Sequence, residues 1–239
     1  MEGMSSSSSS SSNARGTNKD KNNPSCRPKR GSTYLTIGQD LFSINEYVTS
    51  LYNASLHRNN SHSDGHSLPS VASLLPSAFM VYTDIQSLKG LITPVDYGSG
   101  VEYANGLFEL FPASEEAKRQ PKRPQIGLQI GLWISSSCSQ LATGQLDHRI
   151  DELIHYMEII PASRIFLRIG YEFDNPNFGY IHDPQAYQQA FQRIVNACRR
   201  SEHLRQTNKV LFVWHSWAAS FLQQEQLQLF YPGDNYVDW

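Results

Sequence analysis

The 239-residue sequence has few cysteines, no long apolar run and almost no net charge. Its three cysteines, Cys26, Cys138 and Cys198, are odd in number and widely spaced, so they indicate neither a disulfide framework nor a zinc site. No apolar segment approaches the roughly 18 residues that a membrane-spanning helix needs. A net charge of −2 gives no signal for nucleic acid or a membrane surface as a partner.

Three further signatures are missing. Basic residues near the N-terminus are followed by no apolar stretch, so no secretory signal is visible. The segment Asp96–Gly100 contains two glycines but lacks the spacing of a phosphate-binding loop. The polar segment 54–69 holds His57, His62 and His66 without a supporting carboxylate pattern. We therefore expect no metal and no cofactor.

What is present begins with a tail. Residues 1–33 contain the serine run Ser5–Ser12 and the basic cluster Arg27-Pro28-Lys29-Arg30. Such a segment buries too little apolar surface to offset its ordering entropy, so a disordered, solvated tail is expected. Binding of the basic cluster to an acidic surface is the alternative. Residues 34–239 are expected to form the folded domain.

Apolar strands and amphipathic helices alternate at a spacing of roughly 40 residues. The expected strands are 34–37, 79–83, 126–134, 165–169 and 210–214, with the opening of a sixth at 235–239. One expected helix covers 41–51, a second is capped by Asp147, and a third starts at Asp183-Pro184. This alternation predicts an α/β fold with a parallel sheet.

Two α/β architectures fit the pattern. One is an open, doubly wound sheet of five or six strands, complete as it stands. The other is a (β/α)8 TIM barrel, which needs about 250 residues for eight units and would here be incomplete, with five to six units. The missing dinucleotide fingerprint and the apolar segment at the end of the chain favour the incomplete barrel.

A single carboxylate stands out in the stretch Arg164–Asp174. The apolar run 165–169 predicts a buried strand, Gly170 ends it, and Glu172 follows between Tyr171 and Phe173. Barrel enzymes place their chemistry at this end of a strand, and aromatic neighbours that exclude water favour the protonated form of a carboxyl, which suits a proton donor. A salt bridge from Glu172 to Arg168 is the structural alternative.

Several stretches together resemble glycoside hydrolase family 26. They are Arg168–Asp174, Val213-Trp214-His215 and, most specifically, the YPGDNYVDW segment Tyr231–Trp239, with looser matches at Gly38–Asp40 and Ile130–Trp133. The resemblance runs from about Tyr34 to the last residue. It implies a retaining O-glycosyl hydrolase on a (β/α)8 barrel, similar to mannanases, β-1,3-xylanases and mixed-linkage β-glucanases.

The resemblance also implies roles. Glu172 corresponds to the general acid/base, and the nucleophile is a second Glu after the seventh strand, beyond Trp239, so the chain as given is expected to be inactive. Tyr171 stands where mannanases of the family usually have His, which weakens the case for mannan. An endo-acting, monomeric enzyme of β-linked polysaccharide is implied, with no nucleic-acid or membrane partner, and the family is exported.

Other residues near the strand ends are candidate sugar contacts. Trp214 and Trp217 could stack on sugar rings, or one could pack into the barrel wall. His215 could bond Glu172 or a sugar hydroxyl, while Asp174 and Asn177 could reach sugar hydroxyls from the loop. Structural roles are expected for Asp40, Asp84, Asp234 and Asp238. Two other functions stay open: a non-catalytic carbohydrate-binding relative, and an unrelated complete α/β protein.

Overall fold

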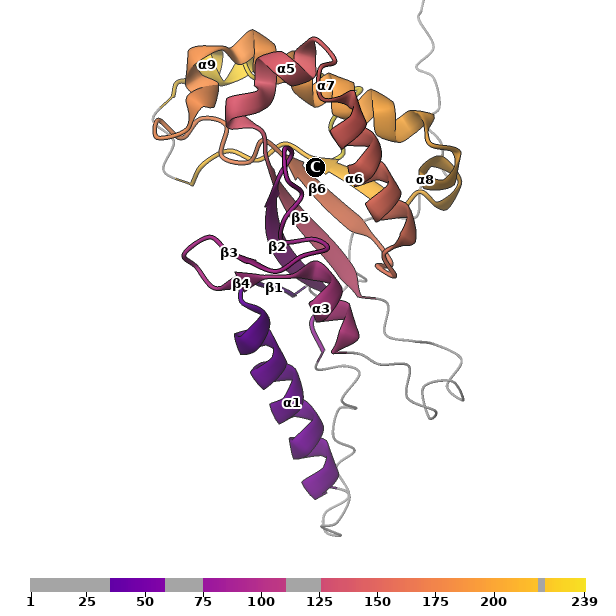
Figure 1. Ribbon diagram of the computed structural model, residues 1–239. Coiled ribbons are helices and arrows are strands. Elements are labelled where there is room, and N and C mark those ends of the chain that lie inside the picture. Colours follow the sequence, from indigo (N-terminus) through magenta and orange to yellow (C-terminus); the bar gives the residue numbers. More distant parts are fainter. Residues whose placement is uncertain (1–34, 59–74, 111–125, 219–221) are drawn as a thin grey trace, which may run out of the picture. The chain divides into compact units, whose positions relative to one another are not determined.

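The computed structural model describes residues 35–58, 75–110, 126–218 and 222–239, without the side chains of 55–58 (Figure 1). The expected tail lies outside this part of the chain. So do His62 and His66 and the side chain of His57, and the interpretation of that histidine segment stays a prediction.

Five parallel strands form the main sheet. They are β1 (Thr36–Ile37), β2 (Ala78–Asp84), β5 (Gly127–Trp133), β6 (Ile165–Ile169) and β7 (Val210–Val213). Their order in the sheet is their order in the chain, with Gly131 opposite Arg168 and Arg168 opposite Val213. The five predicted strands are therefore confirmed, each within two residues of its expected ends.

The sequential order decides between the two architectures considered above. A doubly wound sheet reverses its strand order at a switch point, whereas the strands of a (β/α) barrel follow one another around it. The sheet of the described residues contains no reversal. A doubly wound fold does not fit this sheet, and an incomplete barrel is compatible with it.

A short hairpin follows β2, where the sequence analysis expected only a loop. Strands β3 (Val95–Asp96) and β4 (Val101–Glu102) pair antiparallel. Gly98 and Gly100 between them both have positive φ angles, which glycine adopts without strain. Helix α3 (Ala104–Glu109) comes next. Strands of two residues are too short to show a periodic pattern, which is why these two were not predicted.

Helices follow the strands along the chain. The α-helices of the described residues are α1 (Leu41–Arg58), α3, α5 (Cys138–Ala142), α6 (Asp147–Ile159), α7 (Pro184–Arg200), α8 (Glu202–Thr207) and α9 (Gln224–Gln228). Two 3₁₀ turns, η1 (Ser135–Ser137) and η2 (Gly179–His182), precede α5 and α7. Figure 1 shows α5, α6, α7 and α8 grouped together, with α1 and α3 at the other end of the sheet.

Two of the three expected helices start after an aspartate whose side chain caps the helix. Asp183 caps α7 by accepting a hydrogen bond from the Ala186 N–H (2.9 Å). Asp40 caps α1 through the N–H of Ser43 (3.0 Å), and the Ser43 hydroxyl lowers the pKa of Asp40 to about 2. The expected cap by Asp147 is wrong, because Asp147 is the first helical residue and pairs instead with Arg193.

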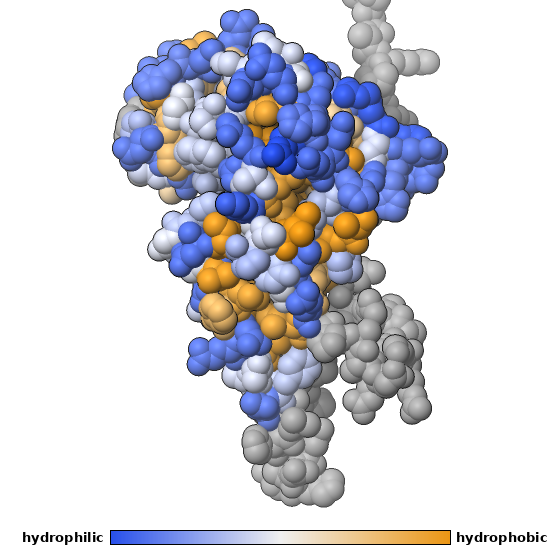
Figure 2. Space-filling view, viewed as in Figure 1, coloured by the Kyte–Doolittle hydropathy of each residue, from blue (hydrophilic) through white to orange (hydrophobic). Residues whose placement is uncertain are grey.

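A continuous apolar core lies between the sheet and the helices. Phe79 and Val81 on β2, Leu167 on β6 and Phe191 and Ile194 on α7 have no exposed surface. Figure 2 shows hydrophilic surface over the upper helices of this view and hydrophobic surface below them, where Figure 1 places α3 and the hairpin.

The last residues lie alongside β7. The N–H groups of Asp238 and Trp239 both donate to the Phe212 carbonyl, and the Asp238 carboxylate accepts the Phe212 N–H (2.9 Å). The expected strand at 235–239 is therefore not formed, although residues 238 and 239 hydrogen-bond to β7. Asp234 accepts from the Tyr231 hydroxyl (2.7 Å), so both C-terminal aspartates have structural roles. No helix in the described residues is long and apolar enough to cross a membrane.

Candidate functional site

The backbone bends sharply where β6 ends. Gly170 has a φ of 57° and Glu172 a φ of 53°, and the left-handed conformation is rare for a residue with a side chain. Two hydrogen bonds hold the bend: Gly170 N–H to the Leu132 carbonyl (2.9 Å) and Glu172 N–H to the His215 carbonyl (2.8 Å). Unusual backbone of this kind concentrates at functional sites, because surrounding structure must hold it in place.

The Glu172 side chain points to a cavity rather than into an ion pair. It is half-buried, and its Oε2 accepts a hydrogen bond from Asn175 Nδ2 at 3.1 Å. The ion pairs found among the described residues are Arg149–Glu152 and Arg193–Asp147. The structural alternative of a salt bridge to Arg168 therefore does not hold. Asn175 had no distinguishing signal in the sequence.

The cavity beside Glu172 has a volume of about 490 Å³, within the usual range for small-molecule sites. It opens at the carboxyl ends of β2, β5 and β6. Its lining combines aromatic rings with polar and acidic side chains. The lining residues are Gln39, Tyr82, Thr83, Asp84, Tyr97, Ser99, Glu102, Trp133, Tyr171, Glu172 and Phe178.

Four rings form one aromatic wall of the cavity, which we call the ring wall: Tyr82, Trp133, Tyr171 and Phe178. Ring centroids lie 4.8 Å apart for Tyr82 and Tyr171, 4.5 Å for Trp133 and Phe178, and 6.0 Å for Trp133 and Tyr171. Burial raises the pKa of Tyr171, so its hydroxyl remains a hydrogen-bond donor at neutral pH. The planes of these rings are inclined to one another by 54° to 85°, so the ring wall offers apolar edges and faces beside the Glu172 carboxyl.

Tyr171 and Phe173 flank Glu172 in the sequence, but only Tyr171 lies in the cavity. Phe173 is fully buried and stacks on Trp214 with centroids 4.6 Å apart and planes 10° apart. Trp214 also packs against Tyr231 (5.0 Å). Strand alternation would place residues 171 and 173 on the same side, so the left-handed backbone of Glu172 accounts for their different surroundings.

Arg168 and His215 form a polar pair that contacts the ring wall. Arg168 is almost fully buried, and its Nη2 lies 3.0 Å from His215 Nδ1. Its Nη1 donates to the Met80 sulfur (3.2 Å), and its guanidinium lies over the Tyr82 and Tyr171 rings. Burial and the Arg168 charge lower the pKa of His215, so the imidazole is neutral and accepts from the arginine.

The remaining predicted contacts have different surroundings. Asp174 is fully buried and accepts from the Ser216 hydroxyl (2.7 Å) and the Trp217 N–H (2.5 Å), so it joins the loops after β6 and β7. Asn177 is exposed, and its N–H donates to Asn175 (3.0 Å). Asp84, on the cavity lining, accepts from the N–H groups of Gln86 and Ser87 and has the structural role expected of it.

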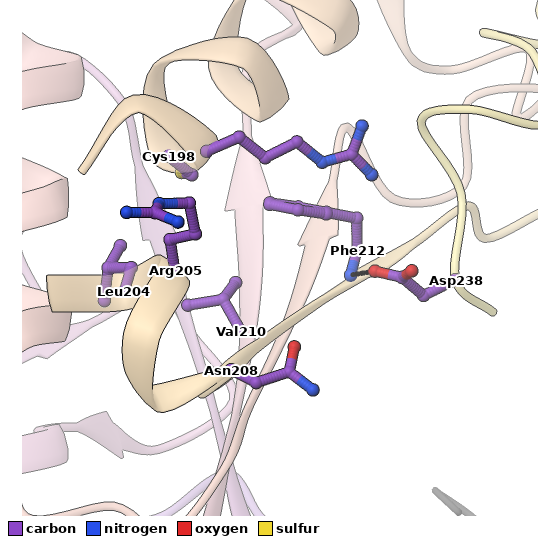
Figure 3. Close-up of a pocket in the computed structure, with 8 residues that line it drawn as sticks. Cys198, Leu204, Arg205, Asn208, Val210, Phe212 and Asp238 are labelled. Atoms are coloured by element: carbon purple, nitrogen blue, oxygen red, sulfur yellow. Dashed lines mark hydrogen bonds between the residues drawn. The ribbon is translucent and has the colours of Figure 1, made fainter. Parts of the chain in front are cut away.

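A second cavity, of about 340 Å³, lies by the start of β7, away from Glu172 (Figure 3). Figure 3 shows Arg205 and Phe212 in its lining, with Asp238 bonded to the backbone of Phe212. In the part of the chain that the structure describes, no three metal-ligating side chains gather in a group that could hold an ion. The cavity beside Glu172 is therefore the candidate site.

Comparison with known proteins gives two similar sequences. The chain is 25% identical over 205 residues to a β-1,3-xylanase of an Alcaligenes species, which covers 86% of this chain and 35% of that protein. It is also 25% identical over 205 residues to the β-1,3-xylanase TXYA of a Vibrio species, covering 86% of this chain and 36% of that protein. No protein-family model matches. The chain thus spans about a third of the length of these curated relatives.

Proposed function

We propose that this chain is a glycoside hydrolase domain acting on β-linked polysaccharide, with Glu172 as the general acid/base. One observation carries the proposal: Glu172, held in a left-handed backbone conformation, lines a cavity with the four rings of the ring wall. The two similar β-1,3-xylanases support the same class of reaction. Neither relative is named a mannanase, so a xylan is favoured over mannan.

The proposed fold is part of a (β/α)8 barrel of the family 26 type. The sequential order of five parallel strands supports it, as does the position of the cavity at their carboxyl ends. Arg168, Tyr171 and Glu172 then belong to one strand end, and His215 to the next. The described residues supply the acid/base half of the site.

In the proposed mechanism the Glu172 carboxyl protonates the glycosidic oxygen as the bond to the sugar breaks. The resulting carboxylate then takes a proton from the water that releases the sugar. Retention of configuration needs a second carboxylate about 5–5.5 Å from the first, acting as nucleophile. We assign that role to no residue of the described chain, since the family resemblance puts it after a seventh strand.

The other predicted residues divide into two groups in this proposal. Tyr171 lines the sugar site, and His215, Trp217 and Asn177 remain proposed contacts around it. Asp174 is buried and Trp214 packs against Phe173 and Tyr231, which gives both a supporting role, since they fix the loops that present the contacts. Asn175 orients the Glu172 carboxyl through their 3.1 Å hydrogen bond.

The test measures hydrolysis of β-1,3-xylan, β-mannan and mixed-linkage β-glucan by the natural full-length protein and by the 239-residue chain. Glu172→Gln should abolish hydrolysis by the active form, while Glu225→Gln, an exposed glutamate on α9, should leave it unchanged. Proton NMR of the first product shows whether configuration is retained. A folded protein that hydrolyses none of the three substrates would count against the proposal, and binding without hydrolysis would favour a non-catalytic carbohydrate-binding protein.

A further inference from the structure

Two polar atoms of the Glu172 cavity have no hydrogen-bond partner. Glu102 has no exposed surface, and its Oε2 accepts from the Tyr82 N–H at 3.1 Å, but its Oε1 is unpartnered. Thr83, 1% exposed, has an unpartnered Oγ1. Both residues line the cavity. Buried polar atoms are nearly always paired, so two orphans on one cavity need an explanation.

The hairpin after β2 brings the Glu102 carboxylate to the edge of β2. Strand β1 pairs with β2 only at Ala78 and Phe79, which leaves the Tyr82 N–H beyond the end of β1. The Glu102 carboxylate fills that place from β4. Gly90 makes room for the approach: a Cβ there would lie 2.4 Å from the Tyr82 carbonyl oxygen and 3.2 Å from Glu102 Cβ. The backbone is therefore shaped around this carboxyl.

Keeping a carboxyl at this position has an energetic cost. Burial chiefly, together with the nearby carboxylates of Asp40 and Asp96, raises the pKa of Glu102 to about 7, although the hydrogen bond from the Tyr82 N–H lowers it. A glutamine would keep the bond to Tyr82 without that cost. Packing alone does not explain a carboxyl oxygen without a hydrogen-bond partner in the lining of a cavity.

Two other uses of Glu102 fit the observations poorly. A glycosidase nucleophile must be ionised, whereas Glu102 holds its proton up to about pH 7 and has one oxygen committed to the backbone. A cation site would need several converging ligands, and no such group is found in the described residues. The unpaired oxygen belongs to a residue that lines the same cavity as Glu172 and the ring wall, which points to a substrate group.

We propose that Glu102 and Thr83 are substrate-binding residues of a sugar subsite in the Glu172 cavity, binding hydroxyl groups of one pyranose unit. This inference rests on the proposed function. The ring wall covers the apolar face of the sugar, while Oε1 of Glu102 and Oγ1 of Thr83 bond its hydroxyl groups. Among the described residues, the cavity lining includes no lysine or arginine that would pair with an acidic sugar, so the subsite takes a neutral sugar in preference to an acidic one.

The cleanest test is Thr83→Val, because valine has nearly the shape of threonine and no hydroxyl. The Thr83 Oγ1 has no partner to lose, so the free energy of unfolding should stay the same or rise. Affinity for a β-1,3-linked xylooligosaccharide, measured by calorimetry on the full chain, should fall by about 10-fold. Thr36→Val, at an exposed position of β1, is the matched control and should change neither quantity.

Glu102 is tested with a pair of variants. Glu102→Ala should lower the same affinity by 10-fold or more, while Glu102→Gln, which keeps the bond to Tyr82 and presents an N–H to the sugar, should retain most of it at pH 5.5. Circular dichroism verifies the fold of each variant. If Glu102→Ala does not fold, Thr83→Val and Glu102→Gln still decide the question.

The outcomes separate this inference from the proposed function. Wild-type binding with unchanged affinity in Thr83→Val and Glu102→Ala overturns the subsite and leaves the glycosidase proposal standing. No binding and no hydrolysis by the wild type overturns both. Tighter binding of an oligouronide than of the xylooligosaccharide overturns the neutral-sugar assignment. Ca²⁺ binding that is lost in Glu102→Gln overturns the sugar subsite in favour of a cation site.

Discussion

Replacing Glu102 with glutamine should make the protein more stable at alkaline pH and leave it nearly unchanged at acid pH. The folded protein binds a proton at Glu102 up to about pH 7, whereas the unfolded chain releases it near the ordinary pKa of 4.5. Ionisation in the folded state is therefore the unfavourable event. The destabilisation is absent below pH 4.5, grows between the two pKa values, and is complete above pH 7.

The size of the effect follows from the separation of the two pKa values. A rise from 4.5 to about 7 corresponds to roughly 3 kcal/mol of destabilisation at pH 8 and to less than about 1 kcal/mol at pH 5. Glutamine has no charge to bury, and its amide oxygen can accept the Tyr82 N–H in place of the carboxylate. The stability gap between Glu102→Gln and wild type should thus widen by about 2 kcal/mol from pH 5 to pH 8.

The assay is equilibrium unfolding in urea, followed by circular dichroism, for wild type and variant at half-unit steps of pH. Differences between the two proteins cancel the titration of every other group. Glu109→Gln, the same substitution on the exposed side of α3, is the control, and its difference from wild type should not depend on pH. A constant gap between Glu102→Gln and wild type from pH 5 to pH 8 would refute the reasoning.

Three further predictions follow from the fold. Gly170→Ala should destabilise the protein by about 2 kcal/mol or more in urea unfolding, because φ is 57° and a Cβ there would lie 2.5 Å from a buried tyrosine ring; an unchanged midpoint would contradict the described bend. Asp183→Ala should cost about 1 kcal/mol through loss of the α7 cap, and Asp183→Asn should restore most of it. With Cys26 replaced by serine, Cys138 and Cys198 should resist a thiol reagent at pH 8 until urea unfolds the protein. The reason is that burial raises the pKa of each thiol to about 12. Rapid labelling of the native protein would show that the core is open.

The sheet and helix α7 were predictable because their signals are local. Buried parallel strands are apolar runs, and α7 combines an Asp-Pro start with a repeating apolar stripe that includes Tyr187, Phe191 and Ile194, all fully buried. The pairing of Asp147 with Arg193 was not predictable, since the two residues are 46 positions apart and meet only when α6 packs on α7.

The candidate site was predictable only in part. Glu172 follows an apolar strand directly, so sequence alone locates it at a strand end. Glu102 has no such signal, because its burial depends on a hairpin of two-residue strands meeting the edge of β2. The sequence also did not indicate whether the Trp214 ring faces the cavity or the core. That orientation depends on the packing of the ring against Phe173 and Tyr231.

The hydrogen bond from the Glu172 amide to the His215 carbonyl has a consequence for protein engineering. The position of Glu172 depends on a neighbouring strand unit, and Asp174 reinforces that link through Ser216 and Trp217. A transplant of the β6 segment alone into a foreign barrel would carry the glutamate without its placement. The smallest transferable piece of this site is two consecutive strand ends with both of their loops.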